Sequence, residues 1–135
     1  MAKLNHIGIA VADLPGMKKL FSLLNFEVQH VEPVPDQGVI THFLPLPLAQ
    51  SNLELLEPIN SEGTVAQFIK RKGPGIHHLS FLVDKGQLGP LCEQLRQEGY
   101  RLIFEQPKAG AHDMKVNFIH PSCCGSILIE VMEPA

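Results

Sequence analysis

The chain has 135 residues, 44% of them apolar and 19% charged, and its 11 basic and 14 acidic residues give a net charge of −3. This length suits one domain, and the composition is that of a globular chain, not a disordered one. The charge balance argues against a nucleic-acid partner, and no apolar run approaches the roughly 20 residues of a membrane-spanning helix. Because no secretion signal precedes the first predicted strand, we expect a cytoplasmic location.

The first predicted element is a strand over residues 4–11, and an amphipathic helix follows it. In the strand, Ile7, Ile9 and Val11 alternate with His6, so the bulky side chains should pack against a helix while His6 faces the other way. The helix is predicted from apolar residues at helical spacing: Met17, Leu20, Phe21 and Leu24.

Three more extended segments complete the first half of the chain: residues 27–32, 39–44 and 53–58. The last segment carries Glu54 between two leucines. Because side chains alternate along a strand, Glu54 should leave the face that packs against the helix.

A short helix over residues 64–72, with Thr64 as its cap, is predicted to link two similar modules. We place the first module at residues 1–60, the linker at 61–75 and the second module at 76–135. Together they should form a single domain.

The second module repeats the order of the first. Its first strand, residues 76–83, carries His78 in the place of His6, and an amphipathic helix follows with a stripe at Leu88, Leu91, Cys92 and Leu95. Extended segments are then expected at residues 101–105, 115–120 and 129–134. The last of these carries Glu130 with the same alternation as Glu54, and Asn25 and Gly99 are plausible stops for the two helices.

Strand alternation turns four polar side chains toward one side of the sheet: His6, Glu54, His78 and Glu130. The spacing from histidine to glutamate is 48 residues in the first module and 52 in the second. Two imidazoles and two carboxylates suit one divalent first-row cation with coordination positions left for water or substrate. We expect Co²⁺, with Mn²⁺, Ni²⁺ and Zn²⁺ as alternatives.

The three cysteines are an odd number, and two of them are adjacent: Cys92, Cys123 and Cys124. Adjacent cysteines have poor geometry for a disulfide or for binding one metal together. We therefore expect reduced thiols, as in a reducing compartment.

The repeated motifs resemble those of the vicinal oxygen chelate superfamily, the glyoxalase and bleomycin-resistance group. Within it, the chain is similar to the methylmalonyl-CoA epimerase family along almost its whole length. The similarity runs through residues 4–11, 34–39, 53–56, 75–78, 110–112 and 118–121. It implies an α+β fold in which two βαβββ modules form a curled eight-stranded mixed sheet around a metal, and it leads us to expect a homodimer.

The resemblance implies an isomerase that interconverts (R)- and (S)-methylmalonyl-CoA by removing and returning the C2 proton, with a cation that stabilises the enolate. One base would be Glu130. The other would be Asp36, which stands where the family has a glutamate that is one methylene longer. His112 is a candidate pocket residue, and Asp113 follows it where the family usually has glycine.

Two other functions remain open for the same fold. A lactoylglutathione lyase of the glyoxalase I kind would use the same four ligands, and a small-molecule-binding resistance protein would bind without catalysis. Lys70, Arg71, Lys72 and Lys108 could meet the phosphates of CoA, although a solvated surface is the simpler interpretation.

Overall fold

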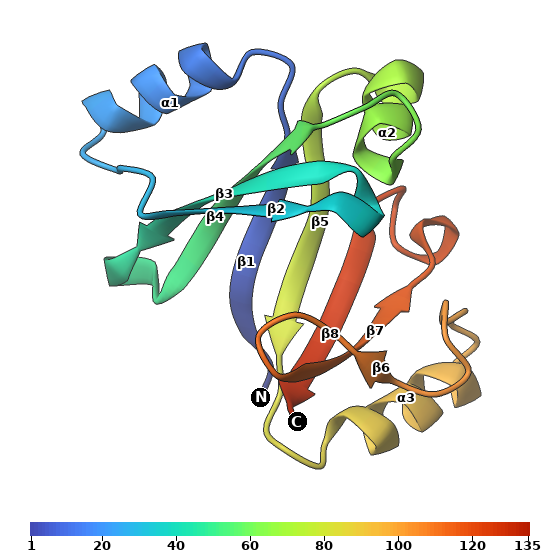
Figure 1. Ribbon diagram of the computed structural model, residues 1–135. Helices are drawn as coiled ribbons and strands as arrows, with labels where there is room; N and C mark the ends of the chain where they lie inside the picture. The colour runs from blue at the N-terminus through green and yellow to red at the C-terminus, as the bar shows by residue number, and fades with distance from the viewer. The chain divides into compact units, whose positions relative to one another are not determined.

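The computed structural model describes all 135 residues, and its elements follow the predicted order (Figure 1). The strands are β1 (Lys3–Ala10), β2 (His30–Val34), β3 (Val39–Leu46), β4 (Ser51–Pro58), β5 (Gly75–Leu82), β6 (Lys108–Ala109), β7 (Met114–Ile119) and β8 (Leu128–Pro134). The helices are α1 (Leu14–Leu23), α2 (Thr64–Lys72) and α3 (Leu88–Gln97). The predicted α+β class, with strand, helix and three strands repeated twice, is confirmed.

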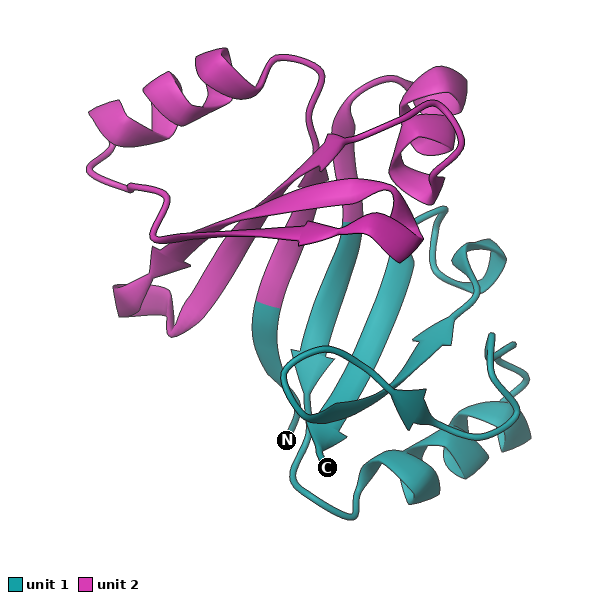
Figure 2. Cartoon of the chain, viewed as in Figure 1, with its two compact units in different colours: residues 1–5, 78–135 teal, residues 6–77 magenta.

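The chain divides into two compact units, which Figure 2 shows in different colours. One unit contains residues 6–77, and the other contains residues 1–5 and 78–135. The strand order is β2-β3-β4-β1 in the first and β5-β8-β7-β6 in the second, and each is mixed, with one parallel pair and two antiparallel pairs.

In the unit of residues 6–77, α1 packs on the sheet face that the alternation of β1 predicted. A core cluster joins Val11, Leu44, Leu53 and Leu55 with partly buried Ile7, Ile9, Leu14, Met17 and Phe21. The predicted helix stripe is only half right, because Leu20 and Leu24 are 50% and 55% exposed. Asn25 follows the helix with φ 65°, a left-handed residue that ends it as expected.

The short helix α2 packs on the opposite face of the same unit. Its Val65 forms a buried cluster with Ala10, Val39 and Leu56, and Phe68 and Ile69 pack against that cluster. Ala10 lies an even number of residues from His6, so α2 covers the face that carries His6. The cap prediction was wrong by one residue, because Gly63, not Thr64, is the N-cap.

In the other unit, α3 packs on β7, β8 and the residue after β5 through the predicted stripe. Buried Leu88 and Cys92, with Leu91 and Leu95 beside them, contact a cluster that contains Val83, Ile119 and Val131. Gly99, with φ 91°, follows the end of the helix as expected. The first turn of α3 is stabilised by a residue that is distant in the sequence. The carboxylate of Glu133 accepts a hydrogen bond from the N–H of Leu88 at 2.8 Å.

The strand predicted at residues 101–105 was wrong. Only an isolated bridge joins Leu102 to Ile119, and the strand that forms is the two-residue β6. The side chain of Asn117 bonds both the N–H and the carbonyl of Phe104, and Arg96 donates to the carbonyls of Phe104 and Glu105. These side chains satisfy backbone groups that a strand would pair in a ladder.

The strand predicted at residues 27–32 is displaced toward the C-terminus. It forms as β2, with Pro33 inside it, and pairs only with β3. Such an edge position tolerates a proline because the missing N–H would face away from the partner strand.

Candidate metal centre

His6 and Glu54 lie next to each other in the unit of residues 6–77. In the parallel pairing of β1 with β4, Gly8 lies opposite Glu54. His6 lies two residues before Gly8, so the side chains of His6 and Glu54 share a face of the sheet. The His6 Nε2 lies 3.1 Å from a Glu54 carboxylate oxygen. Their side chains are only 10% and 14% exposed. A buried carboxylate beside an imidazole needs a positive partner, either a proton on the ring or a cation.

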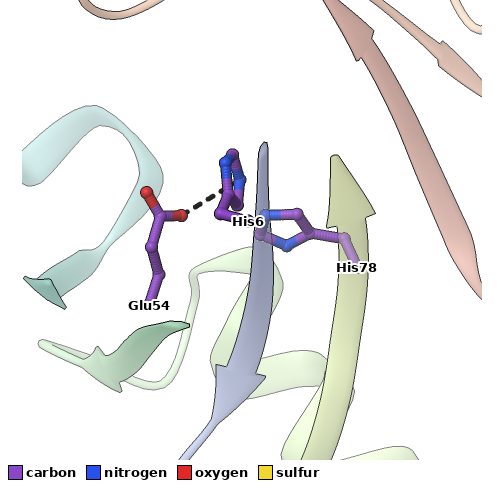
Figure 3. Close-up of side chains that lie close together, drawn as sticks. All are labelled: His6, Glu54 and His78. Atoms are coloured by element: carbon purple, nitrogen blue, oxygen red, sulfur yellow. Dashed lines mark ion pairs between the residues drawn. The ribbon is translucent and has the colours of Figure 1, made fainter. Parts of the chain in front are cut away.

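Three of the four predicted ligands are grouped closely. One ligand atom from each of His6, Glu54 and His78 lies within 4.8 Å of the other two (Figure 3). Nitrogen and carboxylate oxygen are the donors that a divalent first-row cation accepts, so the residues present fit such an ion.

Glu130, the fourth predicted ligand, is held by Ser80. The two residues face each other in the parallel pairing of β5 with β8, and the Ser80 Oγ donates to a Glu130 carboxylate oxygen at 2.5 Å. Burial raises the pKa of Glu130, and the hydrogen bond from Ser80 acts in the opposite direction. A carboxyl group whose pKa moves toward neutral pH is suited to accept and return a proton.

Asp36 lies in a tight turn between β2 and β3. The segment Pro35–Gln37 forms one 3₁₀ turn, and Gly38 closes it with φ 65° and an N–H bonded to the carbonyl of Pro35 at 3.0 Å. The side chain of Asp36 is exposed. Its backbone position is therefore well defined, and the reach of its carboxylate depends on side-chain length.

His112 lies in the exposed turn between β6 and β7. It and Asp113 are both left-handed, with φ 57° and 56°. The second of these positions is where the family resemblance led us to expect glycine. A side chain is strained in this conformation, although aspartate tolerates it better than most residues.

Two further histidines of the unit of residues 6–77, His42 and His77, contact neighbouring side chains. The Nε2 of His42 lies 3.4 Å from a Glu57 oxygen, while its Nδ1 is buried without a partner. The ring of His77 makes an edge-on contact with Phe68. Burial, with the nearby charge of Arg71, lowers the pKa of His77.

The three cysteines are free thiols, as the sequence predicted. Cys92 lies on the buried face of α3, and burial raises its pKa and that of Cys124. No helix of the chain is long and apolar enough to cross a bilayer.

Comparison with known proteins identifies the class to which this fold and site belong. Residues 5–118 match the model of the glyoxalase/bleomycin resistance protein/dioxygenase superfamily. The chain belongs to this superfamily.

Curated relatives narrow the assignment. The mitochondrial methylmalonyl-CoA epimerase of Bos taurus is 35% identical over 97% of this chain and 74% of that protein. The ethylmalonyl-CoA/methylmalonyl-CoA epimerase of Cereibacter sphaeroides is 33% identical over 97% of each chain. The crystal structure of methylmalonyl-CoA epimerase from Mycobacterium tuberculosis has a TM-score of 0.84 and 36% identity over 98% of this chain and 88% of that one. Within the superfamily, the chain belongs to the methylmalonyl-CoA epimerase family.

Proposed function

We propose that this protein interconverts (R)- and (S)-methylmalonyl-CoA, using one divalent cation bound by His6, Glu54, His78 and Glu130. The observation that carries the cation site is the grouping of ligand atoms from the first three residues within 4.8 Å. The epimerase assignment is supported by relatives of that name along nearly the whole chain.

The reaction requires a base that removes the proton at C2, between a carboxylate and a thioester, and an acid that returns a proton to the opposite face. We assign Glu130 to one of these roles. The hydroxyl of Ser80 holds the orientation of its carboxylate.

Asp36 is our candidate for the second base. Its support is the family resemblance of the loop and the fixed turn that holds its backbone. Aspartate keeps the carboxylate that the role requires, but a base displaced by about 1 Å loses on the order of 10²-fold in rate.

The cation would supply charge stabilisation to the oxygens on which negative charge develops when the C2 proton leaves. The chain's own part is to present neutral imidazole nitrogens from His6 and His78 and carboxylate oxygens from Glu54 and Glu130. We propose Co²⁺ as the ion. Mn²⁺, Ni²⁺ and Zn²⁺ are the alternatives, because this donor set accepts all four ions.

The test is proton NMR of racemic methylmalonyl-CoA in D₂O with protein loaded with each of the four metals in turn. Wild type should exchange the C2 proton, and Glu130→Ala should abolish exchange while the protein stays folded by circular dichroism. Absence of exchange by metal-loaded wild type would overturn the epimerase proposal.

Two further assays define the substrate. The name of the Cereibacter relative includes ethylmalonyl-CoA. This compound, used in the same experiment, tests whether a longer acyl branch is accepted. An assay for lactoylglutathione formation should be negative. A positive result would indicate the alternative glyoxalase I activity.

We also propose a homodimer and a cytoplasmic location. Light scattering coupled to gel filtration tests the first, with a mass of twice the 14.9 kDa chain expected. Cell fractionation tests the second.

A further inference from the structure

We propose that the basic last turn of α2, formed by Lys70, Arg71 and Lys72, binds the phosphate groups of the CoA part of the substrate. The inference rests on the proposed function, because it assigns the other end of the same acyl-CoA molecule. It concerns a surface of the unit of residues 6–77 alone.

The first argument is the position of α2. It packs on Ala10 and Leu56, which lie four residues after His6 on β1 and two residues after Glu54 on β4. Each separation is even, so all four side chains share one face of the sheet. At 3.3 Å per strand residue, the distance from His6 to Ala10 is about 13 Å. A substrate whose acyl group lies beside His6 and whose pantetheine arm follows this face therefore reaches α2.

The second argument is charge. Lys70, Arg71 and Lys72 are all exposed and are the only run of three basic residues in a chain of net charge −3. Lys72 also lies over the ring of Phe68, with its ammonium 5.9 Å from the ring centre. A guanidinium binds phosphate through two parallel hydrogen bonds, and flanking ammonium groups add charge.

Lys108, also considered from the sequence, is not included in this site. It belongs to the unit of residues 1–5 and 78–135, whereas the proposed site lies on α2 in the unit of residues 6–77.

A purely structural role predicts something different. Cations at the C-terminal end of a helix also stabilise it through the helix dipole. Such a role would make their loss affect every substrate equally through stability. A phosphate-binding role makes the loss depend on whether the substrate carries the nucleotide.

The experiment compares the double variant Lys70→Gln/Arg71→Gln with the matched control Lys18→Gln/Lys19→Gln. The control removes two exposed lysines from α1, which packs on the opposite face of the sheet. Each protein, metal-loaded, is assayed with methylmalonyl-CoA and with methylmalonyl-pantetheine, which lacks the nucleotide and its phosphates.

For the α2 variant we expect KM for methylmalonyl-CoA to rise about 10-fold with kcat unchanged, as two exposed charge contacts are lost. The charge-reversed pair Lys70→Glu/Arg71→Glu should raise KM further. KM for methylmalonyl-pantetheine should not change, and the α1 control should behave as wild type with both substrates. Equal effects on both substrates, or no effect on either, would overturn the proposal.

A direct binding measurement separates this inference from the epimerase proposal. Calorimetric titration of wild type with CoA should give a dissociation constant that rises about 10-fold in the α2 variant. Should wild type fail to exchange the C2 proton, the epimerase proposal fails while this titration still decides the phosphate site. CoA binding that is absent, or equal in both proteins, refutes the site.

Discussion

Ser80 donates a 2.5 Å hydrogen bond to Glu130, its direct partner across the parallel pair β5 and β8. Ser80 is 0% exposed, so water does not compete for the carboxylate oxygen that it holds. A buried hydrogen bond to a charged group contributes about 1.5–3 kcal/mol. Ser80 is therefore a positioning residue for the proposed base.

Replacing Ser80 by alanine should lower kcat of the epimerase reaction by roughly 10- to 100-fold, the equivalent of that hydrogen bond. KM should change little, because Ser80 orients Glu130 and does not bind substrate. Steady-state kinetics with methylmalonyl-CoA measures both constants. Ser80→Thr restores the hydroxyl and should recover most of kcat; an alanine variant as active as wild type would contradict the role.

Lengthening Asp36 to glutamate should raise kcat, by up to about 10²-fold, if the shorter acid limits proton transfer. The turn around it is closed by Gly38, so the substitution changes the side-chain length and leaves the backbone in place. C2 proton exchange in D₂O gives the rate, with exposed Gln37→Ala as control. If Asp36→Glu were as inactive as Asp36→Ala, Asp36 would not be the base.

Removing metal should lower the melting temperature by several degrees, because an ion that binds only the folded state adds about 2.7 kcal/mol at a concentration 100 times its Kd. Differential scanning fluorimetry with EDTA and with added Co²⁺ measures the shift. His6→Ala should lose the metal-dependent shift. His30→Ala, whose side chain is 61% exposed, should keep it; equal shifts in both variants would refute the ligand assignment.

Glu133→Ala should lower the free energy of unfolding by about 1–3 kcal/mol, since it leaves the N–H of Leu88 without its acceptor. Glu133 is 7% exposed, so water replaces the lost partner poorly. Urea denaturation measures the difference. Glu98→Ala, an exposed change at the other end of α3, should cost less than about 0.5 kcal/mol.

Cys92 should react slowly with maleimide or iodoacetamide in the folded protein. It is 2% exposed, and burial raises its pKa, so little thiolate forms near neutral pH. Its alkylation should accelerate as pH rises and as urea unfolds the chain, whereas Cys123 should react first. Mass spectrometry of timed digests follows each site, and rapid native labelling of Cys92 would contradict its burial.

Strand alternation was sufficient to predict the two faces of the sheet from the sequence. It separated His6 from Ile7 and Ile9, and those isoleucines do pack toward α1. The same reasoning turned Glu130 away from the face that packs against the helix, and the structure places its hydrogen bond with Ser80 on that other face. Periodicity of this kind is local, so it can be read without knowledge of contacts between distant residues.

The failed prediction of a strand at residues 101–105 depended on distant contacts. Residues 101–105 look extended in the sequence, yet Asn117 and Arg96 bind their backbone from β7 and α3. The role of Ser80 was also missed, because a small serine beside His78 carries no signal of its own. Its position directly across from Glu130 follows from the parallel pairing of β5 with β8, a contact between strands that are distant in the sequence.

The two modules begin their first long helices in different ways. Asp13 lies just before α1 and accepts the N–H of Gly16 within the same turn, so α1 has its cap as soon as those residues exist. The start of α3 depends on Glu133, 45 residues later in the chain. During synthesis on a ribosome, the capping bond of α1 can therefore form early, whereas the bond from Leu88 to Glu133 forms only after the last strand has emerged.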